Sequence, residues 1–328
     1  MNAPNPPSPA PDDSVWRPLV DMASPTEDRN LRSLELDTLD AGPLVDLILS
    51  EDATVAAAVQ AVGPQIAELV EDCVRAIAGG ATVRYVGAGT SGRLGVLDAV
   101  ELVPTYNADD TMFTAHLAGG EAAMMRAVEG AEDDEEAGAR LIAQESGPGD
   151  VIIALAASGR TPFVGGALHE ARARGLRTAL ISTNPFAGLA ESADIAILPD
   201  VGSEVVTGST RMKSATAQKL VLNALSTATM VRLGTTYSNL MINVRPTNHK
   251  LIARTVRMLV QGTGADAEVA AGVLQAADGD VRAALVALLA GSGIAPARAA
   301  AAAHPPNPFR SGDPAGIRAA VASLLTTS

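Results

Sequence analysis

The sequence is poor in aromatic residues and in positive charge. Aromatic side chains make up 2% of the 328 residues, so Ala, Val and Leu must fill the core of a folded domain. Lysine and arginine number 24 against 37 aspartates and glutamates, which gives a formal net charge of −13. A nucleic-acid-binding surface needs clustered positive charge, whereas the basic residues here are scattered. We therefore expect no nucleic-acid partner.

Cysteine pairs, histidine clusters and long apolar runs are also missing. Cys73 is the single cysteine and the four histidines are dispersed, so we expect neither a disulfide framework nor a metal or cofactor site. Charges interrupt the apolar runs, which argues against a membrane-spanning helix. Residues 1–14 are rich in proline and lack the basic start and apolar centre of a signal peptide. They predict a disordered tail on a soluble, cytoplasmic protein.

Short apolar runs alternate with helical patterns in the middle of the chain. The apolar runs lie at 83–89, 111–120, 151–159, 177–183 and 194–200. Helical patterns lie between them at 92–102, 121–145, 162–174 and 186–192. This alternation indicates βαβ units. It predicts an α/β fold with a doubly wound, parallel, five-stranded sheet between layers of helices.

Helical periodicity continues on both sides of this region. The N-terminal part is helical over 32–79, where Ser50 and Thr54 are candidate caps and Gly79-Gly80 is a stop. A long helix is predicted at 210–233, and further helices at 248–261, 265–291 and 315–325. We therefore divide the chain into an N-terminal helical segment (15–60), an α/β domain (61–245) and a C-terminal helical module with a tail (246–328).

The stretch YVGAGTSGRLG, residues 85–95, has the glycine spacing of a dinucleotide-binding loop. Such a site also needs an acidic residue about twenty positions on, after the second strand, to bind the ribose. Asp109 and Asp110 lie at about that distance, but they precede the second apolar run. Their position argues against a dinucleotide.

A Ser-Gly-Arg tripeptide follows two different apolar runs. Ser91-Gly92-Arg93 follows the run at 83–89, and Ser158-Gly159-Arg160 with Thr161 follows the run at 151–159. A helix N-terminus offers free N–H groups to an anion, and the carboxyl ends of parallel strands share one edge of a sheet. The repetition predicts a pocket for a small phosphorylated ligand. The alternative is that the hydroxyls of Thr90, Ser91 and Ser158 only cap helices.

The long helix at 210–233 opens with the polar stretch TGSTRMKSATAQK, which contains Ser209 and Lys213. The helix dipole disfavours cations at an N-terminus, so basic residues there suggest an anion nearby. A solvated, capped first turn is the alternative interpretation.

Two acidic stretches offer candidates for proton transfer. Glu101 follows Leu94 and Leu97 on one helical face, just before Pro104 ends the predicted helix. A carboxyl on an apolar face is disfavoured in its charged form and could act as a general acid, although it could equally reach solvent. The run 128–136 is acidic, and spacing alone does not select a base from it.

The segments YVGAGTSGRLGVLDAVE, AVEGAEDDEEAG, AASGRTPFV and EVVTGSTRMKSATAQKLVLNALST resemble the N-acetylmuramic acid 6-phosphate etherase family. The resemblance runs from about residue 26 to about residue 291. It implies a sugar isomerase (SIS) domain at 61–245, a three-layer α-β-α sandwich, and a ubiquitin-associated-like helical module near 265–291.

The resemblance also implies a reaction. The enzyme would cleave the D-lactyl ether of N-acetylmuramic acid 6-phosphate with water, in recycling of cell-wall amino sugars. Glu101 matches the family's acid, and Glu132 matches its second catalytic glutamate, the base and water activator. Ser91, Ser158 and Thr161 match phosphate-binding residues, with Gly92 and Gly159 beside them and Ser209 and Lys213 as neighbours.

One departure from the family pattern follows the predicted acid. Many members have Cys-Pro-Pro-Thr there, whereas this chain has LVPT at 102–105, for which we expect altered packing rather than lost activity. The resemblance further implies a homodimer with sites near the subunit boundary. The alternatives are a phosphosugar-sensing regulatory protein and an aldose–ketose phosphosugar isomerase. One sensor of this ancestry, the glucokinase regulatory protein, is built from two SIS domains, whereas one is predicted here. An isomerase needs no acid at a C3 leaving group.

Overall fold

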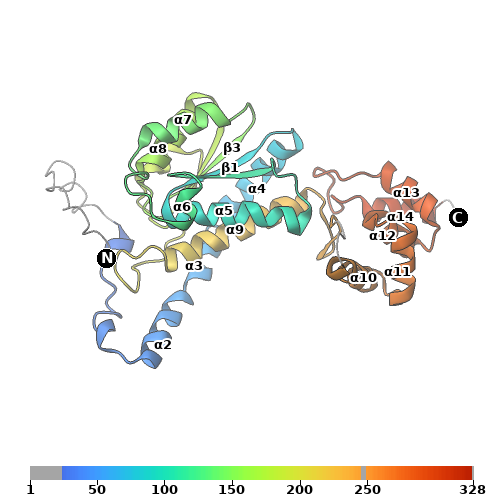
Figure 1. Ribbon diagram of the computed structural model, residues 1–328, viewed down its shortest axis with the longest axis horizontal. Coiled ribbons are helices and arrows are strands. Elements are labelled where there is room, and N and C mark those ends of the chain that lie inside the picture. The colour runs from blue at the N-terminus through green and yellow to red at the C-terminus, as the bar shows by residue number, and fades with distance from the viewer. Residues whose placement is uncertain (1–23, 245–248, 327–328) are drawn as a thin grey trace, which may run out of the picture.

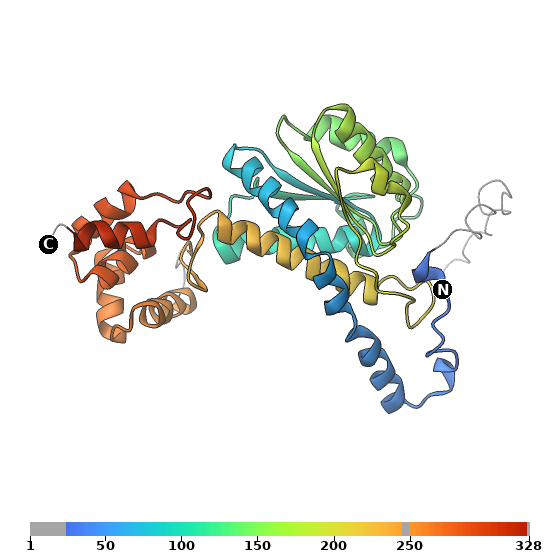
Figure 2. The same cartoon turned by 180° about the vertical axis from the view of Figure 1, so that it is seen from behind.

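The computed structural model describes residues 24–244 and 249–326 (Figure 1). The predicted proline-rich tail at 1–14 lies outside these residues. The described part forms an α/β domain with a helical module at one side of it, and helix α2 extends away from the sheet (Figures 1 and 2).

A parallel sheet forms the centre of the α/β domain. Its five strands pair in the order β2-β1-β3-β4-β5, which confirms the predicted five-stranded parallel sheet. Tyr85 in β1 lies opposite Ala115 of β2 and Ile153 of β3. The strands are β1 (Val83–Gly87), β2 (Phe113–Leu117), β3 (Val151–Leu155), β4 (Arg177–Ile181) and β5 (Ile195–Ile197).

Helices cover both faces of the sheet. The helices of this domain and of the segment before it are α2 (Ala41–Asp52), α3 (Val55–Ala61), α4 (Gly63–Ala78), α5 (Gly89–Tyr106), α6 (Ala122–Met125), α7 (Glu135–Glu145), α8 (Pro162–Ala173) and α9 (Lys213–Arg232). Short 3-10 helices, η1, η2 and η3, lie at Pro25–Glu27, Leu36–Thr38 and Gly188–Ser192.

Strand β3 is apolar throughout because both of its faces are buried. All five of its residues are buried. Ile153 and Leu155 belong to a core shared with α4, α5 and α9, whereas Ile152 and Ala154 belong to a core shared with α7 and α8. Successive side chains of a strand point to opposite faces, so a strand covered on both sides loses its polar alternation.

Several predicted boundaries are confirmed or corrected. Gly79-Gly80 ends α4 as predicted, and Gly80 has a φ of +82°. The predicted continuous helix at 121–145 is wrong, because turns separate the short α6 from α7. Pro104 does not end α5, which continues to Tyr106 and stops at the left-handed Asn107.

The predicted caps in the N-terminal segment are also wrong. Ser50 lies inside α2 and its hydroxyl donates to Leu47 O, 2.8 Å away. Thr54 precedes α3, but its hydroxyl donates backwards to Glu51 O at 2.8 Å instead of accepting from the helix.

The C-terminal part forms a second core of its own. Its helices are α10 (His249–Thr263), α11 (Ala267–Ala276), α12 (Val281–Ala290), α13 (Ile294–Ala303) and α14 (Ile317–Leu325). The segment 265–291 therefore holds two helices, and α13 follows beyond the predicted range. An antiparallel pair, β6 (Thr236–Tyr237) and β7 (Leu240–Met241), leads into this module. Arg232 joins the two parts by donating to Pro308 O at 3.2 Å.

Within residues 24–244 and 249–326, no single helix combines the length and the apolar composition that crossing a membrane requires. Two bent helix pairs, within 41–78 and 281–303, reach that length and composition only when the two helices are taken together.

Candidate functional site

The first predicted phosphate loop joins β1 to α5. Gly89 has a φ of +53°, which a residue with a side chain rarely adopts. A Cβ on Gly87 would lie 2.8 Å from Gly92 Cα, and a Cβ on Gly92 would collide with Leu117 and with Gly87 O. Gly87 and Gly92 therefore allow the first turn of α5 to pack closely against the end of β1. Ser91 is buried in the first turn of α5.

The arginine of this loop supports a neighbouring loop. The Arg93 guanidinium donates to the carbonyl oxygens of Ala123 at 2.8 Å and Met124 at 3.2 Å. It therefore fixes the segment after β2, next to the loop that carries Ser91. Asp109 precedes β2, at the opposite end of the strand from this loop, as the sequence indicated.

The second predicted phosphate loop joins β3 to α8. Gly159 has a φ of +68°, and a Cβ there would overlap Ala187. Asn184 Nδ2 donates to Ser158 O at 3.1 Å and holds the loop against the end of β4. Thr161 is the residue before α8, and its side chain forms no capping hydrogen bond to the helix. The hydroxyl of Thr161 is thus not used as a cap.

Glu132 lies beside this second loop. The backbone oxygen of Glu132 accepts a hydrogen bond from Phe163 N at 3.0 Å, in the first turn of α8. Its side chain is exposed. The turn exists because Gly130 adopts a φ of +74° and Asp134 caps α7 by accepting from Ala137 N at 2.8 Å. The structure therefore brings Glu132 close to Thr161.

Glu101 lies elsewhere. It is on α5, ten residues beyond Ser91, which at 1.5 Å per residue places it about 15 Å further along the helix axis. Of the expected apolar stripe, Leu94 packs against the core, whereas Leu97 is 42% exposed. The neighbouring Val100 is 58% exposed. Glu101 is exposed as well. Within one chain, the structure does not bring Glu101 together with the two loops.

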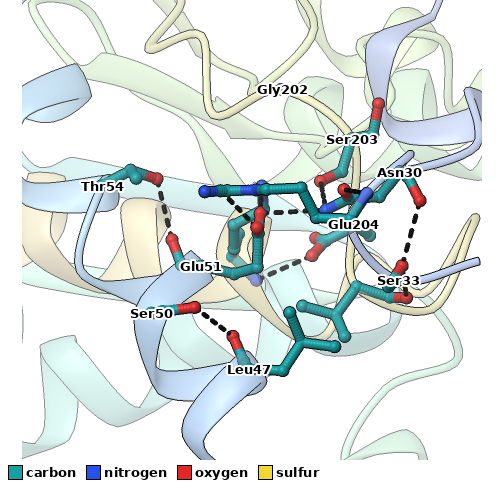
Figure 3. A network of polar contacts seen from close by, with 12 residues as sticks. Asn30, Ser33, Leu47, Ser50, Glu51, Thr54, Gly202, Ser203 and Glu204 are labelled. Atoms are coloured by element: carbon teal, nitrogen blue, oxygen red, sulfur yellow. Dashed lines mark hydrogen bonds and ion pairs between the residues drawn. The ribbon is translucent and has the colours of Figure 1, made fainter. Parts of the chain in front are cut away.

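The loop before α9 carries Ser209 and ends at Lys213. Glu204, which is fully buried, accepts from Lys213 N at 3.0 Å and from Ser214 N at 2.9 Å. Its carboxylate therefore occupies the N-terminus of α9. Figure 3 shows this network of polar contacts.

The side chain of Lys213 has a second internal partner. Its ammonium donates to Glu51 Oε2 at 3.0 Å, and both side chains are less than 5% exposed. Burial raises the pKa of Glu51, but hydrogen bonds from Lys213 and Asn30 and the charges of Lys213 and Arg32 outweigh burial and hold the pKa below its ordinary value. The anion that the basic start of this helix suggested is thus present within the protein, and the predicted contact of Lys213 with a phosphate stays a prediction.

Sequence patterns did not reveal Glu51 or Glu204. Glu51 lies 162 residues before its lysine partner, and Glu204 stands in a loop with no helical or strand period around it. Only the unexpected basic charge at the start of α9 pointed to a missing anion.

A cavity of about 870 Å³ lies at the free edge of β2, between α5 and α7. It is lined by His116, Glu121, Arg140 and Phe163, among others, and by none of the predicted substrate residues. Burial and then the charge of Arg84 lower the pKa of His116, which favours the neutral ring. In the described part of the chain, no group of three or more His, Cys, Asp or Glu side chains is arranged to hold a metal ion.

Comparisons with known proteins cover most of the chain. The family model for the glucokinase regulatory protein N-terminal SIS domain matches residues 65–172. An N-acetylmuramic acid 6-phosphate etherase of Symbiobacterium thermophilum is 50% identical over 266 residues, which are 81% of this chain and 89% of that protein. The etherase of Glaesserella parasuis is 48% identical over 81% of this chain and 88% of that protein.

Among solved structures, a phosphoheptose isomerase from Francisella tularensis has 17% sequence identity and a TM-score of 0.47. The match covers 60% of this chain and 98% of that one.

Proposed function

Because the chain belongs to the N-acetylmuramic acid 6-phosphate etherase family, we propose that it cleaves the D-lactyl ether of N-acetylmuramic acid 6-phosphate with water. The products would be N-acetylglucosamine 6-phosphate and D-lactate. The sequence identity to curated etherases over four fifths of the chain carries this proposal. We further propose that the protein acts in the cytoplasm, in recycling of cell-wall amino sugars.

We propose that the phosphate binds where α5 and α8 begin. Ser91 and Thr161 lie at the starts of two helices that follow neighbouring parallel strands, so their hydroxyls and the helix N–H groups belong to one edge of the sheet. Ser158 and Ser209 would add hydroxyls, while Gly92 and Gly159 allow the close backbone approach. A hydroxyl without an internal capping bond, as at Thr161, is available to a ligand oxygen.

In the proposed reaction, Glu132 removes the C2 proton of the open-chain sugar, which the C1 aldehyde acidifies. The electron pair forms the C2–C3 double bond as the C3–O bond to lactate breaks, and Glu101 gives its proton to the departing oxygen. Glu132 then releases the C2 proton to solvent, and Glu101 is reprotonated from solvent. Water adds its hydroxyl to C3 as Glu132 takes the proton from water, and Glu132 returns that proton to C2 of the resulting enolate. In the elimination, Glu132 thus acts as the base at C2 and Glu101 as the acid at the departing oxygen.

We propose that the enzyme is a homodimer and that Glu101 acts on the sugar held by the other copy. The separation of about 15 Å along α5 supports this, because a phosphate on Ser91 of the same chain leaves the sugar C3 far from Glu101. The exposed apolar side chains around Glu101, with Leu97 and Val103 each 42% exposed, are suited to cover against a second copy.

The direct test is release of D-lactate from N-acetylmuramic acid 6-phosphate. Wild-type protein should release it, and Glu101→Gln and Glu132→Gln should each lower kcat by about 100-fold or more while binding of the product sugar phosphate persists. Binding of the sugar phosphate without lactate release by the wild type would refute the etherase proposal.

A heterodimer of the two variants, co-expressed with different tags, tests the sharing of the site. If Glu101 acts in trans, one of the two sites contains both glutamates, and turnover should recover to about half of the wild-type value. No recovery in a purified heterodimer would place both glutamates on one chain's site.

A phosphosugar-sensing regulatory protein is the second candidate, because the matching family model describes a domain of the glucokinase regulatory protein. That match spans both predicted catalytic glutamates and therefore does not favour sensing over catalysis. The lactate assay separates the two.

A further inference from the structure

The loop that carries Ser209 is held by residues far away in the sequence. This segment, 203–213, runs from Ser203 and the buried Glu204 to the first residue of α9. We define the brace as residues 24–33 together with Glu51. Figures 1 and 2 show that this N-terminal stretch lies against the loop before α9.

The brace contacts the loop at three backbone positions. Asn30 Nδ2 donates to Ser203 O at 3.5 Å, and Ser33 Oγ donates to Val205 O at 2.7 Å. The N–H of Gly208 donates to the carbonyl oxygen of Thr26 at 2.9 Å. Gly208 is the neighbour of Ser209, so the last of these bonds fixes the backbone next to that hydroxyl.

The far end of the loop is held by charge. Lys213 binds Glu51 at 3.0 Å, and Glu51 also accepts from Asn30 Nδ2 at 2.9 Å (Figure 3). Arg32 forms an ion pair with the other oxygen of Glu51. Asn30 therefore links the start of the loop, at Ser203, to its end, at Lys213, through one carboxylate.

We propose that the brace positions the substrate loop, with Asn30 and Ser33 as positioning residues for the phosphosugar. The inference rests on the proposed function, because it takes Ser209 as a ligand of the sugar phosphate. Neither Asn30 nor Ser33 touches the substrate. They keep the loop in its binding conformation before the ligand arrives, which lowers the entropic cost of binding.

The test compares three variants. Asn30→Ala/Ser33→Ala removes the side-chain bonds to Ser203 O and Val205 O. Ser33→Ala alone removes the hydroxyl contacts to Val205 O and Asn30 O and leaves the buried ion pair intact, so it remains informative if the double variant folds poorly. Thr38→Ala is the matched control, since its hydroxyl donates to Glu35 O, just beyond the brace in the chain, and has no bond to the loop among the described residues.

The measurement is the Kd for N-acetylglucosamine 6-phosphate by calorimetry, with KM, kcat and Tm alongside. We expect Kd and KM to rise about tenfold in the double variant, by less in Ser33→Ala, and not at all in Thr38→Ala, with kcat nearly constant. A merely structural role would lower Tm and the active fraction, and thereby apparent kcat, while Kd and KM stayed at the wild-type values. That result would overturn the proposal.

The two proposals fail differently. If the wild type releases no lactate but binds the sugar phosphate, the etherase proposal is wrong and the Kd comparison still tests the brace. If the wild type releases lactate and both variants bind like the wild type, the brace proposal is wrong and the etherase proposal stands.

Discussion

The starts of α8 and α9 look alike in the sequence and differ in the structure. Both follow a strand of the same sheet, and both are rich in Ser, Thr and basic residues. At α9, the buried Glu204 accepts hydrogen bonds from two N–H groups, and Glu51 neutralises Lys213. At α8, Thr161 provides no side-chain cap, and Pro162 has no N–H.

The difference concerns where the anion comes from. A helix N-terminus attracts negative charge whether it belongs to the chain or to a ligand. At α9 the chain supplies its own carboxylate. We call this helix start, with Glu204, Glu51 and Lys213, a structural joint, because it connects segments of the same chain. At α8, the Thr161 side chain forms no capping bond, and the acceptor that Phe163 N binds is a neutral one, the backbone oxygen of Glu132, which suits a ligand phosphate. Two similar sequence patterns can therefore have different functions.

The largest expected effect comes from breaking the joint at α9. Glu204→Gln retains one acceptor but turns an amide group toward the second N–H, so we expect a loss of roughly 2–3 kcal/mol of unfolding free energy. Chemical denaturation measures it. Glu136→Gln is the control, because Glu136 forms only an exposed ion pair with Arg140, worth about 0.5 kcal/mol. Equal stability of Glu204→Gln and the control would contradict the assignment of α9 as a structural joint.

We expect an intermediate effect from a substitution at the start of α8. Thr161→Val removes a hydroxyl that makes no capping bond, so Tm should change little. If the hydroxyl binds the sugar phosphate, Kd should rise about tenfold, which corresponds to one lost hydrogen bond to a charged group. Thr38→Val serves as the control for the hydroxyl-to-methyl change. A normal Kd together with a lowered Tm would make Thr161 structural and remove the contrast with α9.

The sequence predicted the features that depend on local pattern. Apolar runs such as 151–159 predicted the strands, because a strand buried on both faces has no polar alternation. The repeated Ser-Gly-Arg predicted two loops at the same sheet edge, since parallel strands end on one side. Asp109 precedes β2 in the structure, as the sequence indicates, and this position argues against a dinucleotide site.

The sequence could not predict features that depend on distant contacts. Glu51 and Lys213 lie 162 residues apart, and no local period relates them. The helical pattern at 121–145 hid the turn that carries Glu132, because the dihedral freedom of Gly130 and the cap at Asp134 override helix propensity there. Pro104 predicts a helix stop, yet α5 accommodates it in its last turn.

The smallest expected effect is a pH dependence that separates the two helix starts. The folded-state pKa of Glu51 lies below its ordinary value, although burial opposes this, because Lys213, Asn30 and Arg32 stabilise the carboxylate. The ion pair therefore stabilises the fold above the ordinary glutamate pKa of about 4.3, and this contribution is lost as pH falls through the folded pKa.

Wild-type Tm should fall with acidification below about pH 5 more steeply than the Tm of Glu51→Gln, which has no charge to lose at this position. Thr161→Val should keep the wild-type slope, because this substitution removes no ionisable group. Parallel Tm curves for wild type and Glu51→Gln would show that Glu51 contributes no pH-dependent stability, and the joint at α9 would then depend on Glu204 alone.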